Sequence, residues 1–469
     1  MDYNTVRKRE LRINNLKLAK RLARDYDPLR KTIILLPGGG GSLLERSEEK
    51  YDNPNPGSFE YEEVWIDLGI FKPARDAHKL EIQDDGRDKG DKIIIPNGPL
   101  DFLVKPYDGT KKFFKLRDYN YIGYGFDWRR PLNECAKLLE EFLLEFKSLV
   151  MAKGEENPLK RTTLICHSHG GLIATLFLQN IFHGTNPTPS AVSQWIDKVI
   201  TVATPFYANS GHIRRYYRGE KMLNMLGYKK KRLAQIMSTL PGPYIFLYLD
   251  KDTYNQDVGD LEISEYPMVD ADDESIDVDP YNPLSWSRFP DWINNHYITE
   301  AKKIRRKYTR RLSKSVRDRI YHLRGVEDKR TLNRLRWKNI DGSSFDPRYD
   351  KAPIKIKNSD YGPGDGTVPA WGARLAQIPL ERTYDLKKAK KHMDLMEHEE
   401  TLEVIRFTIE NNRLPKKMSV KNKKYLGIKS ASGPTVDNFL LGIENGTISV
   451  NSKKASDPKI WRALISSMV

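Results

Sequence analysis

One short segment constrains the fold of this chain more than any other. Residues 162–165 (TTLI) read as a buried strand, residues 166–171 (CHSHGG) read as a turn, and the apolar residues 172–178 read as a helix. A serine on a sharp turn between a strand and a helix is the arrangement of a nucleophile elbow. The sequence therefore predicts that Ser168 is a nucleophile, although a Gly-Gly turn with Ser168 as a simple helix cap would give the same pattern.

The residues around Ser168 also bear on the chemistry. A strained elbow needs small residues two positions before and two positions after the serine, and these positions hold Cys166 and Gly170. Cys166 stands where such elbows usually have glycine. The flanking His167 and His169 have no third ligand at a readable spacing, so we expect neither a metal nor a cofactor.

The order of the remaining residues points to an acid and a base. In α/β-hydrolases a catalytic serine is followed along the chain by Asp or Glu and then by His. Asp365 lies in a Gly/Pro-rich turn, and only His392 and His398 follow it. His392 ends a lysine-rich loop, whereas His398 falls within a predicted helix over residues 394–409. A catalytic base belongs on a loop after the last strand, so we predict Asp365 and His392 as partners of Ser168.

A glycine-rich loop is the candidate oxyanion hole. It spans residues 37–42 (PGGGGS) and follows the apolar strand 32–36. Glycine lets backbone N–H groups approach a ligand closely, so the N–H groups of Gly39 and His169 are the predicted donors. A phosphate-binding loop is the alternative, but it requires a Lys-Ser/Thr pair that this loop lacks.

Seven motifs in a fixed order resemble a known family. They are PGGGGS at 37–42, VWIDL at 64–68, YGFDWR at 124–129, CHSHGG at 166–171, ATPF at 203–206, GDGTVP at 364–369 and HMDL at 392–395. This order resembles the lecithin:cholesterol acyltransferase family of α/β-hydrolases, which includes lysosomal phospholipases, phospholipid:diacylglycerol acyltransferases and bacterial esterases. The resemblance covers about residues 31 to 410.

The resemblance implies acyl transfer from a lipid ester through Ser168, Asp365 and His392. It also implies that Trp65 lies on a lid segment near the acyl site, although an ordinary core tryptophan fits equally well. The lid disulfide of the secreted animal members is absent, because Cys135 and Cys166 are the only cysteines. Any lid must therefore be held by packing.

Composition limits the compartment and the partners. Lys and Arg total 79 against 63 Asp and Glu, which gives a net charge of +16. We expect peripheral contact with an anionic membrane surface and no nucleic acid, because no nucleic-acid motif accompanies the basic charge. No stretch reaches transmembrane length, no secretory signal is visible, and two cysteines suit a reducing compartment, so we expect a cytoplasmic protein. The oligomeric state is left open.

The pattern along the chain predicts an α/β-hydrolase fold with a mostly parallel central sheet and an inserted, largely helical cap. The expected parts are a basic N-terminal helical extension, the first part of the core with a lid-like insertion at about 43–120, the cap, the second part of the core, and a Lys-rich C-terminal extension. Their ranges are 1–27, 28–206, 207–317, 318–415 and 416–469. The basic helix is expected to pack on the enzyme body rather than on a membrane. The cap's aromatic residues fit a lipid groove and a cap core equally.

These observations predict a serine-dependent acyl hydrolase or O-acyltransferase acting on lipid esters. A carboxylesterase, thioesterase or peptidase of the same fold is the nearest alternative. A non-catalytic lipid-binding or interaction protein is a more remote one, because such a protein has no physical reason to keep Ser168, Asp365 and His392.

Overall fold

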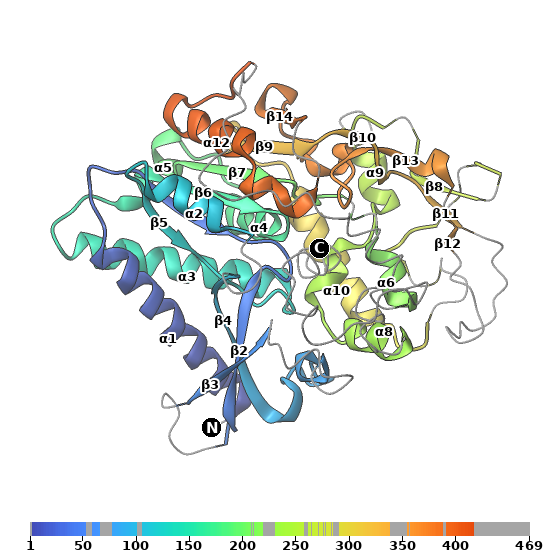
Figure 1. The fold of residues 1–469 in the computed structure, drawn as a ribbon, viewed down its shortest axis with the longest axis horizontal. Helices are drawn as coiled ribbons and strands as arrows, with labels where there is room; N and C mark the ends of the chain where they lie inside the picture. The colour runs from blue at the N-terminus through green and yellow to red at the C-terminus, as the bar shows by residue number, and fades with distance from the viewer. Residues whose placement is uncertain are drawn as a thin grey trace, which may run out of the picture.

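The computed structural model describes most of the chain up to residue 416 (Figure 1). The described residues are 2–52, 59–65, 77–100, 106–207, 209, 211–218, 230–257, 261–263, 265–270, 272–274, 276, 278–282, 284, 290–337, 354–355, 357–387 and 391–416. The Lys-rich extension beyond residue 416 and the aromatic residues Trp286 and Phe289 of the expected cap lie outside them.

A six-stranded parallel sheet forms the centre of the molecule. Its strands, in spatial order, are β14 (Thr383–Leu386), β9 (Ile320–Gly325), β7 (Lys198–Val202), β6 (Thr162–His167), β1 (Thr32–Leu36) and β5 (Asn120–Gly123). Every neighbouring pair is parallel. β1, β6 and β7 are buried along their whole length, which explains their nearly continuous apolar sequences. The strand that leads to Ser168 is thus one of the two central strands.

Helices cover both faces of this sheet, and others lie in the segment between β7 and β9; those that the structure describes are given next. The helices are α1 (Tyr3–Arg24), α2 (Asp108–Lys115), α3 (Leu132–Met151), α4 (His169–Phe182), α5 (Pro189–Ser193), α6 (His212–Arg218), α8 (Lys230–Ser238), α9 (Lys251–Asp257), α10 (Asn295–Thr309), α11 (Lys314–Arg317) and α12 (Glu399–Asn411). Short 3-10 helices are η2 (Ala77–Leu80), η3 (Lys89–Asp91), η4 (Pro158–Arg161), η5 (Gly242–Phe246), η8 (Asn358–Asp360), η9 (Ala370–Ala373), η10 (Leu380–Arg382) and η11 (His392–Glu397).

Alternate residues of each strand pack into two separate hydrophobic cores, one on each face of the sheet, because successive side chains point to opposite faces. Ile34 and Leu36 pack with the apolar faces of α3 and α4, whereas Ile33 and Leu35 pack with those of α2 and α12. Figure 1 shows α12 and α1 on opposite sides of the sheet. The result is a three-layer α/β/α fold, and the predicted α/β-hydrolase class is confirmed.

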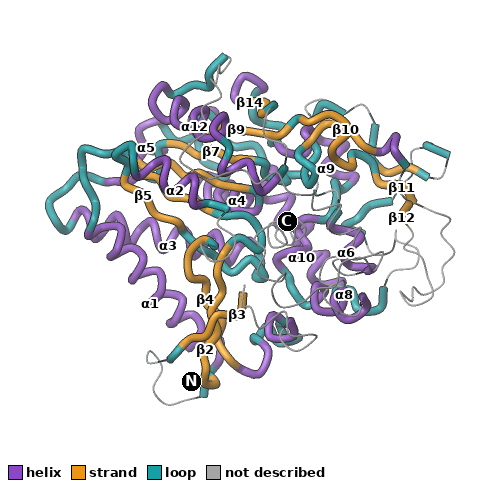
Figure 2. The backbone as a smooth tube through the Cα atoms, in the orientation of Figure 1, coloured by secondary structure: helices purple, strands orange, loops and turns teal. Residues whose placement is uncertain are grey.

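Two smaller sheets and a strand pair lie outside the central sheet. One antiparallel sheet has the order β3-β2-β4, with β2 (Ser42–Lys50), β3 (Tyr61–Trp65) and β4 (Lys92–Pro99); it projects from the body near the N-terminus in Figure 2. The strand pair consists of β10 (Glu327–Leu332) and β13 (Tyr361–Gly364). The second small sheet has the order β12-β11-β8, with β12 (Ile354–Lys355), β11 (Leu335–Trp337) and β8 (Met268–Val269). The sheet β3-β2-β4 occupies the segment in which a lid-like insertion was expected.

The basic helix α1 packs on the enzyme body. Val6, Leu11 and Leu22 are buried, and Arg7 Nη2 donates to Glu134 Oε1 of α3 at 2.7 Å. The side chain of Asp2 caps the helix by accepting a hydrogen bond from the backbone N–H of residue 5.

A buried ion-pair network joins α1 to the core. Asp88 accepts hydrogen bonds from Arg129 Nη2 (2.9 Å), Arg130 Nη2 (2.6 Å) and Tyr3 Oη (2.6 Å). Arg129 also forms a bidentate pair with Asp127, at 2.9 and 2.6 Å. Burial alone would raise the pKa of Asp88, but the surrounding guanidinium groups outweigh it and hold this pKa below its usual range.

The segment between β7 and β9 contains helices α6, α8, α9, α10 and α11, of which α6, α8 and α10 gather beside one another in Figure 1. The side chain of Arg305 on α10 is fully buried and connects several parts of this segment. Its Nη2 donates to the carbonyls of Ile245 and Leu247, at 3.1 and 2.7 Å, and its Nη1 donates to that of Tyr207, at 3.1 Å. The domain boundaries given above stay predictions. Among the described helices, none is long and apolar enough to cross a membrane.

Candidate active site

Ser168 occupies a strained turn between β6 and α4. Its φ is 49° and its ψ is −118°, a combination that costs a non-glycine residue about 1–3 kcal/mol. The N–H of Ser168 donates to the carbonyl of Val202 at 2.8 Å, which holds the turn against β7. Ser168 Oγ is buried and has no hydrogen-bond partner among the described residues. The turn therefore presents an unengaged hydroxyl at the carboxyl edge of the sheet.

Small residues let this turn pack closely. A Cβ on Gly170 would lie 2.7 Å from the carbonyl oxygens of Leu36 and Pro37, so only glycine fits there. Cys166, on the other side of the serine, is fully buried in the core as a free cysteine. Burial raises the pKa of its thiol well above the usual value, so this thiol is a packing group rather than a nucleophile.

Asp365 and His392 are brought together by their side chains and their backbones. Asp365 Oδ2 lies 2.7 Å from His392 Nδ1, and the His392 N–H donates to the Asp365 carbonyl at 3.0 Å. Asp365 Oδ1 accepts two more hydrogen bonds, from the backbone N–H groups of Thr367 (2.9 Å) and Val368 (2.7 Å). His392 Nδ1 carries the ring proton and donates it in a hydrogen bond to the Asp365 carboxylate. The neutral ring then has no proton on Nε2, which is therefore an acceptor. This Nε2 is buried and has no partner within the described part of the chain.

His398 lies elsewhere. The helix expected over residues 394–409 is replaced by the 3-10 helix η11, followed by α12 from Glu399. His398, with a φ of −81° and a ψ of 131°, is the cap residue between them. His392, by contrast, is held by Asp365 through two hydrogen bonds, one to its ring and one to its backbone.

The glycine loop and the elbow, which hold the two expected oxyanion donors, lie close together. A Cβ on Gly39 would lie 3.6 Å from His169 Nδ1, and one on Gly38 would lie 3.2 Å from the Ser168 Cβ, so the glycine loop passes directly beside the elbow. His169 is the first residue of α4, and its N–H therefore has no carbonyl partner within the helix.

The imidazole of His169 is enclosed by aromatic rings. Its ring centroid lies 5.1 Å from that of Phe126 and 4.8 Å from that of Phe246, both in edge-on geometry. Burial lowers the pKa of His169 to about 3, so this ring is neutral at physiological pH. Phe246 comes from the segment between β7 and β9 and covers His169, and its ring would also lie 3.7 Å from a Cβ on Gly39. Consistent with this cover, the side chains of Ser168 and His392 are at most 1% exposed.

Trp65 packs beside the glycine loop. Its Nε1 donates to the carbonyl of Gly40 at 2.7 Å, and its ring meets that of Trp128 at 5.2 Å. Trp65 is buried in the core, next to the loop that holds Gly39. A role of Trp65 in substrate binding stays a prediction.

Three neighbours of the site were not assigned a role from the sequence. Gly325 ends β9, where a Cβ would lie 2.7 Å from the Cβ of Asp365, so it makes room for the acid. His167 is hydrogen-bonded to the backbone of the base His392, and Tyr107 is hydrogen-bonded to Gly38 of the glycine loop. Of these three residues, only His167 has a sequence feature that could have indicated its role, namely its position directly before Ser168. No group of three or more His, Cys, Asp or Glu side chains within the described residues is arranged to hold a metal ion.

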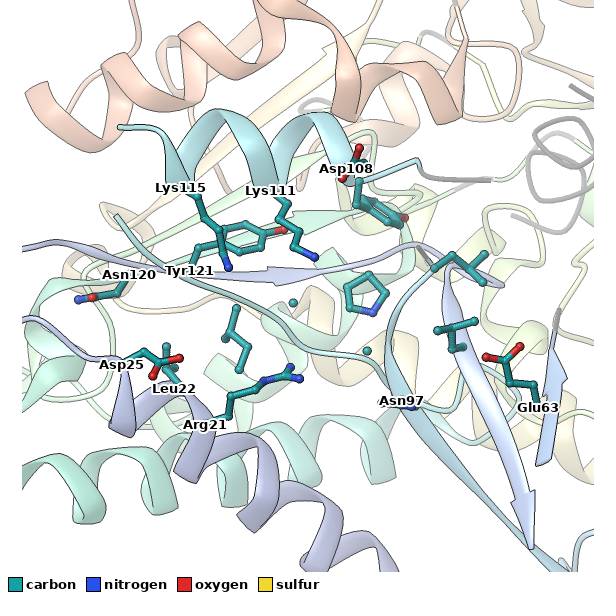
Figure 3. A pocket seen from close by; sticks show the side chains of 17 residues that line it. Arg21, Leu22, Asp25, Glu63, Asn97, Asp108, Lys111, Lys115, Asn120 and Tyr121 are labelled. Carbon is teal, nitrogen blue, oxygen red and sulfur yellow. The ribbon is translucent and has the colours of Figure 1, made fainter. Parts of the chain in front are cut away.

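A separate pocket of about 460 Å³ lies between α1, α2 and the edge strand β5 (Figure 3). Lys111 and Lys115 of α2 line one side, and Arg21 of α1 lines the other. Ser168, Asp365 and His392 do not line this pocket, whereas Tyr107 does.

Comparisons with known proteins agree with the sequence motifs. Residues 114–333 match the family model described as Lecithin:cholesterol acyltransferase. Phospholipase A(1) LCAT3 of Arabidopsis thaliana is 22% identical over 307 residues, which span 61% of this chain and 64% of that protein. The chain thus matches slightly less than two thirds of the length of this relative.

Two solved structures are similar at low identity. One, of a Tle4–Tli4 complex, has 12% identity and a TM-score of 0.45 over 80% of this chain and 96% of that chain. The other, of Bacillus licheniformis lipase BlEst2 in mature form, has 13% identity and a TM-score of 0.30 over 83% and 94%. The family match and the Arabidopsis relative confirm the predicted resemblance of this chain to the lecithin:cholesterol acyltransferase family.

Proposed function

We propose that this protein is a serine-dependent acyl hydrolase or O-acyltransferase that acts on lipid esters. The observation that carries the proposal is the pairing of Asp365 Oδ2 with His392 Nδ1 at 2.7 Å, against His167, the residue that directly precedes the strained Ser168. His392 Nε2 and Ser168 Oγ are both buried and unpaired in the described structure, and they are the atoms between which a proton must pass.

The proposed reaction has two halves. Ser168 Oγ attacks the ester carbonyl while His392 Nε2 takes the hydroxyl proton, and the N–H groups of Gly39 and His169 stabilise the oxyanion. The tetrahedral intermediate then expels the alcohol, which receives the proton from His392, and an acyl-serine remains. Water or a second alcohol repeats the sequence on the acyl-enzyme, and the acyl group leaves as an acid or a new ester.

The family match and the phospholipase relative support lipid esters as the substrate class. The net charge of +16 supports peripheral contact with an anionic lipid surface. Water as the acceptor gives hydrolysis and an alcohol gives transfer, and the two share every residue named above.

The test is a substrate panel that is run with the wild-type protein and with Ser168→Ala. It compares a phospholipid, short-chain and long-chain esters, an acyl thioester and a peptide, with and without a long-chain alcohol as acceptor. We expect turnover of long-chain lipid esters that disappears in the variant. Turnover of the thioester or peptide alone would replace the proposal with a thioesterase or peptidase, and equal activity of Ser168→Ala would overturn the mechanism.

A further inference from the structure

A buried tyrosine connects the glycine loop to the residue that precedes the serine. Tyr107 lies immediately before α2, and its Oη is 2.7 Å from the Gly38 backbone nitrogen and 3.0 Å from His167 Nδ1. A phenol has one proton, and here its oxygen accepts the Gly38 N–H. The hydroxyl proton is therefore donated to His167 Nδ1.

This direction fixes the state of His167. A neutral imidazole whose Nδ1 accepts a hydrogen bond has its proton on Nε2. His167 Nε2 lies 3.1 Å from the carbonyl oxygen of His392, so it donates to that oxygen. The backbone N–H of His392 in turn donates to the Asp365 carbonyl at 3.0 Å. One chain of hydrogen bonds thus runs from the loop after β1 to the acid.

We propose that Tyr107 and His167 are positioning residues that hold the glycine loop and the main chain of His392 in place around Ser168. This inference rests on the proposed function, because it assigns them to the same reaction. Gly38 directly precedes the expected oxyanion donor Gly39, so Tyr107 anchors one side of the reacting centre. His167 anchors the other side through the carbonyl of the base.

The surroundings of His167 require it to stay neutral. Burial and the neighbouring His392 lower the pKa of His167 well below its usual value. The two rings lie 4.8 Å apart and are inclined by 39°. During acyl transfer His392 becomes an imidazolium, and a second positive charge at this distance would oppose that step. Only the neutral form of His167 can both accept from Tyr107 and tolerate a charged His392.

The first test removes one oxygen atom. Tyr107→Phe keeps the ring but leaves the Gly38 N–H and His167 Nδ1 without their partner. A misplacement of about 1 Å costs about 100-fold in rate, so we expect kcat to fall by about 10- to 100-fold. KM should change by less than about threefold, because the proposal gives both residues a positioning role and neither a role in substrate binding.

Tyr124→Phe is the matched control. Tyr124 follows β5 and is also buried, and its Oη bonds to Asn15 Oδ1 at 3.4 Å, away from the site. Loss of its hydroxyl should leave kcat within about twofold of the wild type. A fall in kcat confined to Tyr107→Phe separates positioning from a general loss of packing.

A second set of variants tests His167 directly. His167→Phe keeps a flat ring but has neither donor nor acceptor, whereas His167→Gln has both on one side chain. We expect the phenylalanine variant to lose kcat and the glutamine variant to recover part of it. The double variant Tyr107→Phe/His167→Phe should be no slower than the slower single variant, because both changes break one chain.

Each outcome bears on one proposal. If Ser168→Ala abolishes turnover and folded Tyr107→Phe keeps wild-type kcat, the positioning role is wrong and the proposed function stands. The positioning role is equally wrong if His167→Gln is as slow as His167→Phe. This second comparison tests the positioning role even if Tyr107→Phe does not fold. If Ser168→Ala keeps full activity, the proposed function itself fails.

Discussion

Replacing Asp365 with asparagine probes the arrangement of the acid and the base with almost no change in shape. The Oδ1 position accepts two backbone N–H groups, from Thr367 and Val368, at 2.9 and 2.7 Å. An amide NH2 group placed there would face two donors, so the asparagine must keep its oxygen at this position. Its NH2 group must then take the Oδ2 position, 2.7 Å from His392 Nδ1.

That orientation reverses the hydrogen bond to the base. An NH2 group donates, so His392 Nδ1 must accept and the imidazole proton moves to Nε2. A protonated Nε2 cannot take the proton of Ser168. In a serine protease the equivalent change lowers kcat by about 10⁴, which at 1.36 kcal/mol per tenfold is about 5.4 kcal/mol. We expect a loss of that order in Asp365→Asn, with KM nearly unchanged because Asp365 acts through the proton position on His392.

The assay is steady-state hydrolysis of a long-chain ester at neutral pH. Asp385→Asn is the control, because Asp385 is a more exposed carboxylate that pairs with Arg324 at 2.7 Å outside the site. A kcat for Asp365→Asn within tenfold of the wild type would refute the argument, since the wrong tautomer cannot support that rate.

Further predictions concern the base, the buried ion pairs and the lipid surface. His392→Ala should lower kcat by at least about a thousandfold in ester hydrolysis and His398→Ala should change it little, and the reverse ranking would move the base to His398. Asp88→Asn should lower the free energy of unfolding by about 3–5 kcal/mol in urea titrations, because it leaves buried guanidinium groups unpaired; a loss below about 1 kcal/mol would contradict this. Because the pKa of Asp88 is lowered in the folded state, its contribution to stability should be complete above about pH 5 and should decline as the pH falls toward the folded-state value. Asp88→Asn should lack this pH dependence. Anionic vesicles should be hydrolysed faster than neutral ones at low salt, and this advantage should shrink toward 0.15 M salt, where the Debye length is about 8 Å; equal rates on both vesicles and on a soluble short-chain ester would argue against a lipid surface.

The parts of the fold that follow from local sequence were predictable. The apolar runs of β1, β6 and β7 are long enough to indicate fully buried parallel strands, and the small residues around Ser168 indicate the turn. The antiparallel strand β2 (SLLERSEEK) was not predicted, because its charged residues give no continuous apolar run. The helix expected from residue 394 begins at 399, because a 3-10 helix starting at His392 precedes it.

The contacts that join distant parts of the chain could not be read from the sequence. Tyr107 lies 69 positions from Gly38 and 60 from His167, and no local pattern marks a tyrosine whose hydroxyl bridges two loops. Asp88 lies in a polar stretch, and only the fold brings Arg129 and Arg130 to its carboxylate. Such residues are specified by tertiary packing alone.

The central claim is that Ser168 becomes acylated, and intact-mass analysis after treatment with a fluorophosphonate tests it most directly. Such a reagent forms a stable bond with a serine hydroxyl that a neighbouring base activates. The account predicts one adduct on the wild-type protein and none on Ser168→Ala. An adduct of the same mass on the alanine variant, or no adduct on a folded wild-type protein, would contradict it.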